Sequence, residues 1–312
     1  MDDVASGAPS DTGLTWTQGI ARANGIDIAW EQAGPEHGEP LLLIMGLGRQ
    51  LITWPKPMCE ALVARGMRLI RFDNRDIGLS GSGDRGVRFD VVKDMLKAKV
   101  GMRVAANYTL HDMTEDTLQL LDALGLERVH VAGVSMGGMI AQLLASKHAD
   151  RVRSLTSIMS NTNHPWLPSP AWAIMRHLSA PIAADCPRDV AIAHAIQMGR
   201  LIGSPAFPKS EATLRAEAER AFDRAFRPEG GRRQSHGIIA TGSIEDFVKT
   251  IRAPTQVIHG SADRLVRPQG GERTAKLVRD SRLTMIEGMG HDLPEGVLPR
   301  LVALIADNVA RA

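Results

Sequence analysis

The sequence predicts an α/β fold with a mostly parallel, doubly wound sheet and an inserted helical cap, and three observations carry this prediction. Short apolar runs alternate with helix-like segments, short links join them, and the alternation breaks only between about residues 161 and 250. Continuous apolar runs such as residues 41–45 are typical of strands buried on both faces, as in a parallel sheet. Regular alternation of strand and helix makes a doubly wound sheet the simplest architecture.

The individual elements follow from local patterns. Residues 15–20 and 25–32 alternate like two antiparallel strands joined by a turn at Asn24-Gly25. Buried strands are expected at residues 41–45, 68–72, 128–132, 152–159, 255–259 and 283–287. Helices are expected at residues 55–65, 114–124, 139–146, 210–226 and 294–310.

The chain divides into three parts. Residues 1–12 are expected to be a disordered lead-in, and residues 13–160 with 251–312 to form the α/β core. Residues 161–250 carry several prolines between helix-like runs and no strand pattern, which indicates a helical cap. The alternative for this segment is a set of ordinary covering helices.

Composition excludes several function classes. Of 312 residues, 44% are hydrophobic and 23% charged, as in ordinary globular proteins. The 37 Lys and Arg are scattered among 35 Asp and Glu, so neither a nucleic-acid nor an acidic-lipid partner is expected. The two cysteines, Cys59 and Cys186, show no metal-ligand spacing, so no metal is expected, and a reduced cytoplasmic setting fits best. The N-terminus has no signal-peptide pattern, and no apolar run approaches the roughly 18 residues of a membrane span.

The most informative motif is Gly133-Val134-Ser135-Met136-Gly137, which lies between a predicted buried strand and a predicted helix. This arrangement is typical of a nucleophile elbow, in which a sharp turn pushes the serine hydroxyl clear of the sheet. Side chains two residues either side of the serine would collide, which explains the two glycines. The alternative is an incidental glycine-rich turn.

A serine nucleophile needs a base, and the base needs an orienting acid, in the chain order serine, acid, histidine. Asp263 follows the strand predicted at 255–259, and His291 follows the strand predicted at 283–287. Since parallel strands end at one edge of the sheet, Ser135, Asp263 and His291 are expected to meet there. The alternatives are a helix-capping role for Asp263, a structural role for His291, and Asp292 as a rival acid.

Acyl transfer also needs hydrogen-bond donors for the developing oxyanion. The backbone N–H of Met136 and that of Leu47, in the loop Gly46-Leu47-Gly48, are the candidates, although this loop could be a plain strand-to-helix turn. Candidate substrate-binding residues are Met45, Gly46, Met159 and Trp166, with ordinary core packing as the alternative for each. In the nearby segment, Asp73 and Arg75 are expected to form an ion pair that shapes the loop beside the oxyanion strand, with direct substrate contact as the alternative.

Four motifs together resemble the α/β-hydrolase-fold serine hydrolases over nearly the whole chain, and within them bacterial esterases of the aclacinomycin methylesterase type. They are the elbow, the segment 72–80 (FDNRDIGLS), the acid loop 259–263 and the base loop 290–292. Many relatives carry His-Gly where this chain has Met45-Gly46. The resemblance implies a helical cap over the site but does not fix the substrate. We expect a cofactor-free hydrolase of small to medium carboxylic esters that forms an acyl-enzyme on Ser135.

Two kinds of alternative remain. One is another activity on this fold: an aminopeptidase, a carbon–carbon bond hydrolase or a perhydrolase. The other is a non-catalytic ligand receptor. A small-molecule ester is the expected partner, and both a monomer and a homo-oligomer remain open.

Overall fold

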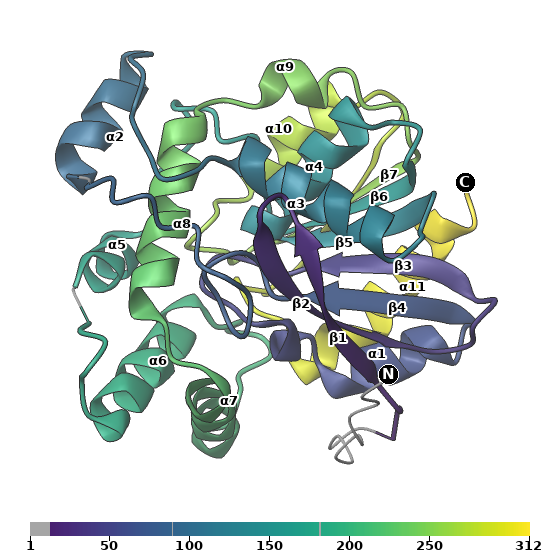
Figure 1. The fold of residues 1–312 in the computed structure, drawn as a ribbon, viewed down its shortest axis with the longest axis horizontal. Helices are drawn as coiled ribbons and strands as arrows, with labels where there is room; N and C mark the ends of the chain where they lie inside the picture. Colours follow the sequence, from purple (N-terminus) through teal and green to yellow (C-terminus); the bar gives the residue numbers. More distant parts are fainter. Residues whose placement is uncertain (1–12, 89, 181) are drawn as a thin grey trace.

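The computed structural model describes residues 13–88, 90–180 and 182–312, and its centre is an eight-stranded sheet (Figure 1). The strands lie in the order β1-β2-β4-β3-β5-β6-β7-β8. Their bounds are β1 (Thr17–Ala23), β2 (Ile26–Ala33), β3 (Glu39–Ile44), β4 (Met67–Phe72), β5 (Val129–Val134), β6 (Val152–Ile158), β7 (Thr255–Gly260) and β8 (Arg282–Ile286). β2 pairs antiparallel with β1 and β4, and the other pairs are parallel. The predicted fold class is therefore confirmed, with each predicted strand in place.

Helices cover both faces of the sheet. α1 (Lys56–Val63) and α11 (Leu298–Val309) pack on one face. α3 (Leu110–Ala123), α4 (Met136–Lys147) and α10 (Gln269–Leu277) lie on the other. The short 3-10 helices η1 (Leu51–Thr53) and η2 (Glu295–Val297) precede α1 and α11.

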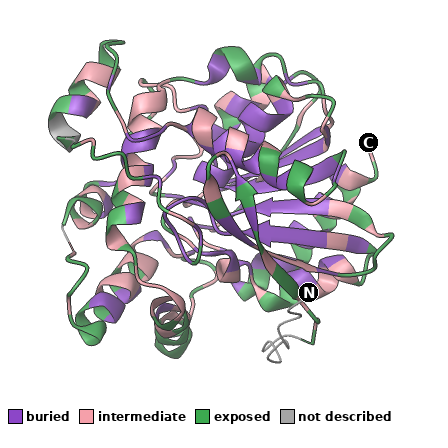
Figure 2. Ribbon diagram, in the orientation of Figure 1, coloured by how far each residue is buried: buried purple, intermediate pink, exposed green. Residues whose placement is uncertain are grey.

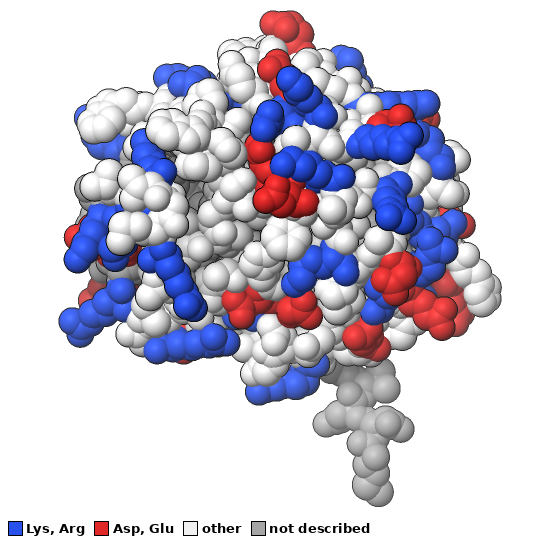
Figure 3. All heavy atoms as spheres, turned by 90° about the horizontal axis from the view of Figure 1, so that it is seen from above, with Lys and Arg blue, Asp and Glu red and all other residues white. Residues whose placement is uncertain are grey.

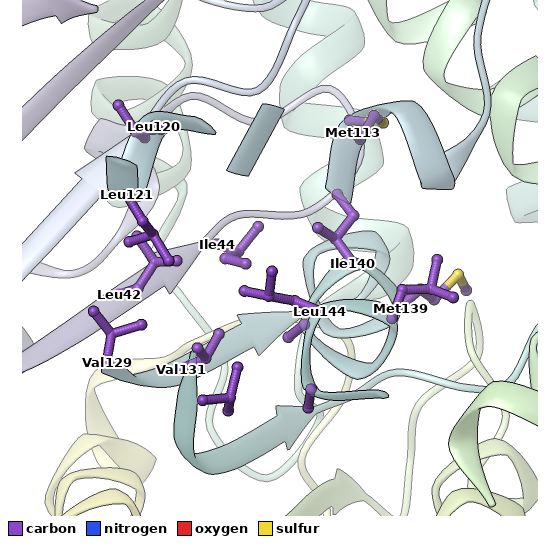
Figure 4. Packing of buried hydrophobic residues seen from close by; sticks show 14 of the residues in the cluster. Leu42, Ile44, Met113, Leu120, Leu121, Val129, Val131, Met139, Ile140 and Leu144 are labelled. Atoms are coloured by element: carbon purple, nitrogen blue, oxygen red, sulfur yellow. The ribbon is translucent and has the colours of Figure 1, made fainter. Parts of the chain in front are cut away.

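The period-two alternation of β3 explains why two cores form. Leu41 and Leu43 belong to the cluster that includes the buried side chains of α1 and α11. Leu42 and Ile44 point to the opposite face, toward Ile140 of α4 and the apolar side of α3 (Figure 4). Because both faces are covered, the strand consists of a continuous apolar run. Figure 2 shows the same division, with buried strands between half-exposed helices.

Between β6 and β7 the chain is helical. It forms α5 (Trp172–Ser179), α6 (Arg188–Ile202), α7 (Glu211–Arg224), α8 (Pro228–Thr241) and α9 (Glu245–Val248). Figure 1 shows α5 to α8 gathered on the left, at one end of the sheet. By contrast, α9 packs against α4 and α10, so this end of segment 161–250 lies with the core helices.

Residues 91–99 form a helix that was not predicted. α2 (Val91–Lys99) begins after Asp90, whose side chain accepts a hydrogen bond from the backbone N–H of Lys93. It packs against α8, outside the two main cores. The expected N-terminal lead-in, residues 1–12, lies outside the described residues. Within the described ranges, no helix is long and apolar enough to cross a bilayer.

Candidate active site

Ser135 sits at the sharp turn between β5 and α4. Its backbone has φ 55° and ψ −119°, a conformation that a non-glycine residue adopts only under strain. A Cβ on Gly133 would lie 2.3 Å from the carbonyl oxygen of Gly137, and one on Gly137 would lie 2.2 Å from that of Ile44. Real atoms do not approach so closely, so both positions require glycine. The local geometry is that of the elbow expected from the motif.

Ser135, His291 and Asp263 are brought together at the carboxyl ends of three strands. The Nε2 atom of His291 lies 3.0 Å from Oγ of Ser135, and its Nδ1 atom lies 2.6 Å from Oδ2 of Asp263. Ser135 follows β5, Asp263 follows β7 and His291 follows β8. We refer to these three residues as the Ser135 array.

The surroundings of Asp263 keep it ionised. Burial raises the pKa of its carboxyl group, but the charges and hydrogen bonds of His291 and His259 outweigh burial and hold that pKa well below its usual range. Oδ1 accepts hydrogen bonds from the backbone N–H groups of Leu265 and Val266, each at 2.9 Å. An ionised carboxylate can only accept, so Nδ1 of His291 must carry the proton, which leaves Nε2 as the acceptor facing Ser135.

The loop that carries Leu47 lies directly against Ser135. A Cβ on Gly46 would lie 3.2 Å from Cβ of Ser135, so the loop backbone approaches the serine closely. Two side chains hold this loop. Asn74 donates from Nδ2 to the carbonyl of Met45 at 2.9 Å, and Gln234 of α8 accepts from the N–H of Gly48 at 2.8 Å. Neither Asn74 nor Gln234 was predicted, although Asn74 falls within the motif at residues 72–80.

The loop of His291 is held by the end of α6. The N–H of His291 donates to the carbonyl of Ile202 at 2.7 Å, and the N–H of Gly290 donates to Oγ of Ser204 at 2.8 Å. The hydroxyl of Ser204 in turn donates to Asp292. Asp292, the rival acid, therefore faces Ser204, and Asp263 occupies the position against Nδ1 of His291.

The expected ion pair between Asp73 and Arg75 is wrong. Asp73 pairs with Arg224 of α7 at 2.8 Å and accepts a hydrogen bond from the N–H of Leu51 at 2.8 Å. The guanidinium of Arg75 forms a buried pair with Asp116 of α3, with Nε at 2.6 Å from Oδ2. Both residues thus stabilise the segment beside the Leu47 loop, but through partners distant in sequence.

The expected pocket residues fall into two groups. Met45 and Met159 are buried in the cluster on the α1 and α11 face of the sheet. Trp166 is largely exposed, and its expected role in substrate binding stays a prediction. A cavity of about 1050 Å³ lies beside the Ser135 array, between segment 199–209 and the loop after β7. The residues that line it include Asp263, Asp292, Ser204, Lys209 and Arg267.

Within the described part of the chain, no group of three or more His, Cys, Asp or Glu could hold a metal ion.

Comparison with known proteins identifies the family. The α/β hydrolase fold family matches residues 39–295, most of the chain. The chain belongs to this family. It is 25% identical to rhodomycin D methylesterase DnrP of Streptomyces peucetius over 90% of this chain and 94% of the relative. It is 29% identical to a putative carbamate hydrolase RutD of Variovorax paradoxus over 85% of this chain and 90% of the relative.

Solved structures agree with this assignment. The structure of an enol-lactonase from Burkholderia xenovorans LB400 matches with a TM-score of 0.72 at 21% identity, covering 94% of this chain and all (100%) of that one. This similarity confirms the α/β-hydrolase fold. The similarity to methylesterases confirms the resemblance inferred from the sequence, and the chain is a member of a hydrolase family.

Proposed function

We propose that this α/β hydrolase is a serine carboxylesterase that acts on small to medium carboxylic esters through an acyl-enzyme on Ser135. One observation carries the proposal: His291 bridges the Ser135 hydroxyl and an ionised Asp263, with 3.0 Å and 2.6 Å between the respective atoms. Similarity to two rhodomycin D methylesterases adds support for ester bonds.

The geometry suggests the following sequence of steps. Ser135 Oγ attacks the ester carbonyl carbon while Nε2 of His291 takes its proton, and Asp263 stabilises the resulting imidazolium. Collapse of the tetrahedral intermediate breaks the bond to the leaving oxygen, which receives the proton from His291. Water then attacks the acyl-enzyme and loses a proton to His291. The bond between the acyl carbon and Oγ of Ser135 breaks, His291 returns the proton to Oγ, and the carboxylic acid leaves.

The oxyanion requires fixed donors beside Ser135. We assign this role to the N–H groups of Met136 and Leu47. Met136 is the first residue of α4, so its N–H lies at the positive end of a twelve-residue helix. The Leu47 loop is anchored by Asn74 and Gln234 on its two sides, which fits a donor that must keep its position during reaction.

An aminopeptidase activity is disfavoured by the charges of the cap. Such an enzyme needs free carboxylates near the cap to bind the substrate's amine. The candidates on α7 each pair with a cation: Glu217 with Lys209, Glu219 with Arg215, and Asp223 with Arg188. We also infer a cytoplasmic location, since Cys59 and Cys186 are both free thiols.

A substrate panel tests the proposal. p-Nitrophenyl esters of increasing acyl length, an enol-lactone, an alkyl carbamate, a vinylogous 1,5-diketone and an aminoacyl anilide are offered to the wild-type chain and to Ser135→Ala. We expect ester turnover to be the fastest and to fall at least about 10⁴-fold in Ser135→Ala. Preference for the carbamate, the diketone or the anilide, or substantial ester turnover by Ser135→Ala, would overturn the assignment.

A further inference from the structure

Large apolar side chains are exposed on α2, on the residues that follow it, and around the start of α5. The exposed fractions are 65% for Leu96, 66% for Val100, 59% for Met102, 80% for Trp166 and 75% for Trp172. We call these five residues the apolar patch. Single exposed apolar residues are common, but a group that includes two tryptophans marks an interaction surface.

The two segments that carry the apolar patch both contact α8. On one side, Asp94 of α2 lies 3.4 Å from Nε2 of His236. On the other, Asn163 donates from Nδ2 to the carbonyls of Ile238 at 2.7 Å and Gly242 at 2.8 Å. Both segments thus contact the same two turns of α8. Figure 1 shows α2, α8 and α5 at one end of the molecule. Figure 3 shows a hollow at that end, with uncharged and basic side chains and a few acidic ones around it.

The charges around the apolar patch are mostly positive. α2 and the residues after it contribute Lys93, Lys97, Lys99 and Arg103. The acidic residue within α2, Asp94, is buried and pairs with Lys97 at 3.1 Å. Asp90, at the start of the helix, caps it and keeps its negative charge at the surface. Residues 164–180 contain no Asp or Glu.

We propose that the apolar patch and its surrounding basic residues dock this hydrolase on an anionic lipid surface. A basic helix with exposed leucine, valine and methionine lies in the plane of a lipid interface, with its apolar side chains inserted and its lysines among the headgroups. Tryptophan prefers the same depth, because its ring is apolar and its N–H is polar. A second copy of the chain fits less well, since a two-fold contact would set the basic residues against themselves.

The docking surface lies beside the Ser135 array. α8 holds the Leu47 loop through Gln234, and the N–H of Ala171, just before α5, donates to the carbonyl of Arg264 at 2.9 Å, next to Asp263. Docking would therefore bring the lipid near the cavity beside Asp263, which Pro168 and Ser169 also line. The proposal revises the expectation that the protein has no acidic-lipid partner, because basic residues that are scattered in the sequence as a whole gather on and after α2. The docking proposal does not depend on the proposed ester hydrolysis.

Vesicle binding by the whole chain tests the proposal. The wild-type chain is sedimented with vesicles of phosphatidylglycerol and phosphatidylcholine, and separately with phosphatidylcholine alone, at low ionic strength. The test variant is Leu96→Ser/Val100→Ser/Trp166→Ser. The control is Ile20→Ser, which removes an exposed apolar side chain from β1. Thermal unfolding checks that all variants fold.

We expect the wild type and Ile20→Ser to bind the anionic vesicles, and binding to the neutral vesicles to be at least about tenfold weaker. Partitioning onto the anionic vesicles should be at least about tenfold weaker for the test variant than for the wild type. Replacing Trp166 and Trp172 with Phe should remove any blue shift in fluorescence caused by the vesicles. Equal binding by wild type and test variant, absence of binding to anionic vesicles, or concentration-dependent dimerisation that only the test variant loses would overturn the proposal. Ser135→Ala should bind like wild type, so a failure of docking is distinguishable from a failure of the proposed chemistry.

Discussion

Replacing Asp263 with Asn removes the group that sets the tautomer of His291. The Asn oxygen retains the hydrogen bonds from the N–H groups of Leu265 and Val266, so its amide nitrogen replaces Oδ2, 2.6 Å from Nδ1 of His291. Two donors then face each other, and the imidazole moves its proton to Nε2. Flipping the amide does not help, because two backbone N–H groups would each lose an acceptor at about 1–3 kcal/mol.

With a proton on Nε2, His291 cannot accept the proton of Ser135. In serine hydrolases the wrong histidine tautomer lowers kcat about 10⁴-fold, which corresponds to an increase of about 5 kcal/mol in the activation free energy. The assay is steady-state hydrolysis of p-nitrophenyl acetate, with thermal unfolding to verify folding. Asp292→Asn is the matched control, because Asp292 accepts its hydrogen bond from Ser204, and its activity should stay within about tenfold of wild type. The reasoning is refuted if Asp263→Asn keeps more than about a tenth of the activity, or if Asp292→Asn is the variant that loses it.

Three further predictions concern stability and the elbow. Burial lowers the pKa of His130 from 6.5 to about 4, so below pH 6.5 the unfolded chain binds a proton that the folded chain does not. The free energy of unfolding should therefore fall by up to about 3 kcal/mol as the pH falls from 6.5 to 4. In His130→Gln, urea titrations should show a weaker dependence of this free energy on pH. Gly137→Ala would place a Cβ 2.2 Å from the carbonyl of Ile44; we expect about 1–3 kcal/mol of destabilisation and loss of ester turnover, and wild-type activity would contradict the strain argument. Arg75→Met leaves Asp116 buried without its guanidinium and should cost about 3–5 kcal/mol in urea unfolding, whereas a change below about 1 kcal/mol would show that the pair contributes little.

The parallel sheet and the positions of the Ser135 array could be predicted because their signals are local. Each buried strand is a short apolar run that ends at a polar or glycine-rich loop. The elbow glycines are required by backbone contacts within five residues of each other, and by the carbonyl of Ile44 on the neighbouring strand. Topology then brings the ends of β5, β7 and β8 to one edge, so three distant side chains follow from strand order alone.

Features that depend on packing between distant segments could not be predicted. Asp73 and Arg75 are close in sequence, yet Arg224 and Asp116 lie in better positions for pairing. A single glutamine in a helix, such as Gln234, carries no signal that its amide reaches the Gly48 N–H. α2 lacked a predicted counterpart because its exposed apolar side chains give no clear core-facing stripe. The residue type made Trp166 a candidate for substrate binding, and only the fold shows that its side chain is largely exposed.

The proton path from Ser135 to His291 is the feature on which the proposed chemistry depends, and covalent labelling by a fluorophosphonate tests it most directly. Intact-mass analysis of the wild-type chain should show one adduct, located on the peptide that contains Ser135. Asp263→Asn should label at least about 10³-fold more slowly, since the hydroxyl is no longer activated. An unlabelled wild-type chain, an adduct on another residue, or equal labelling rates for wild type and Asp263→Asn would contradict the account.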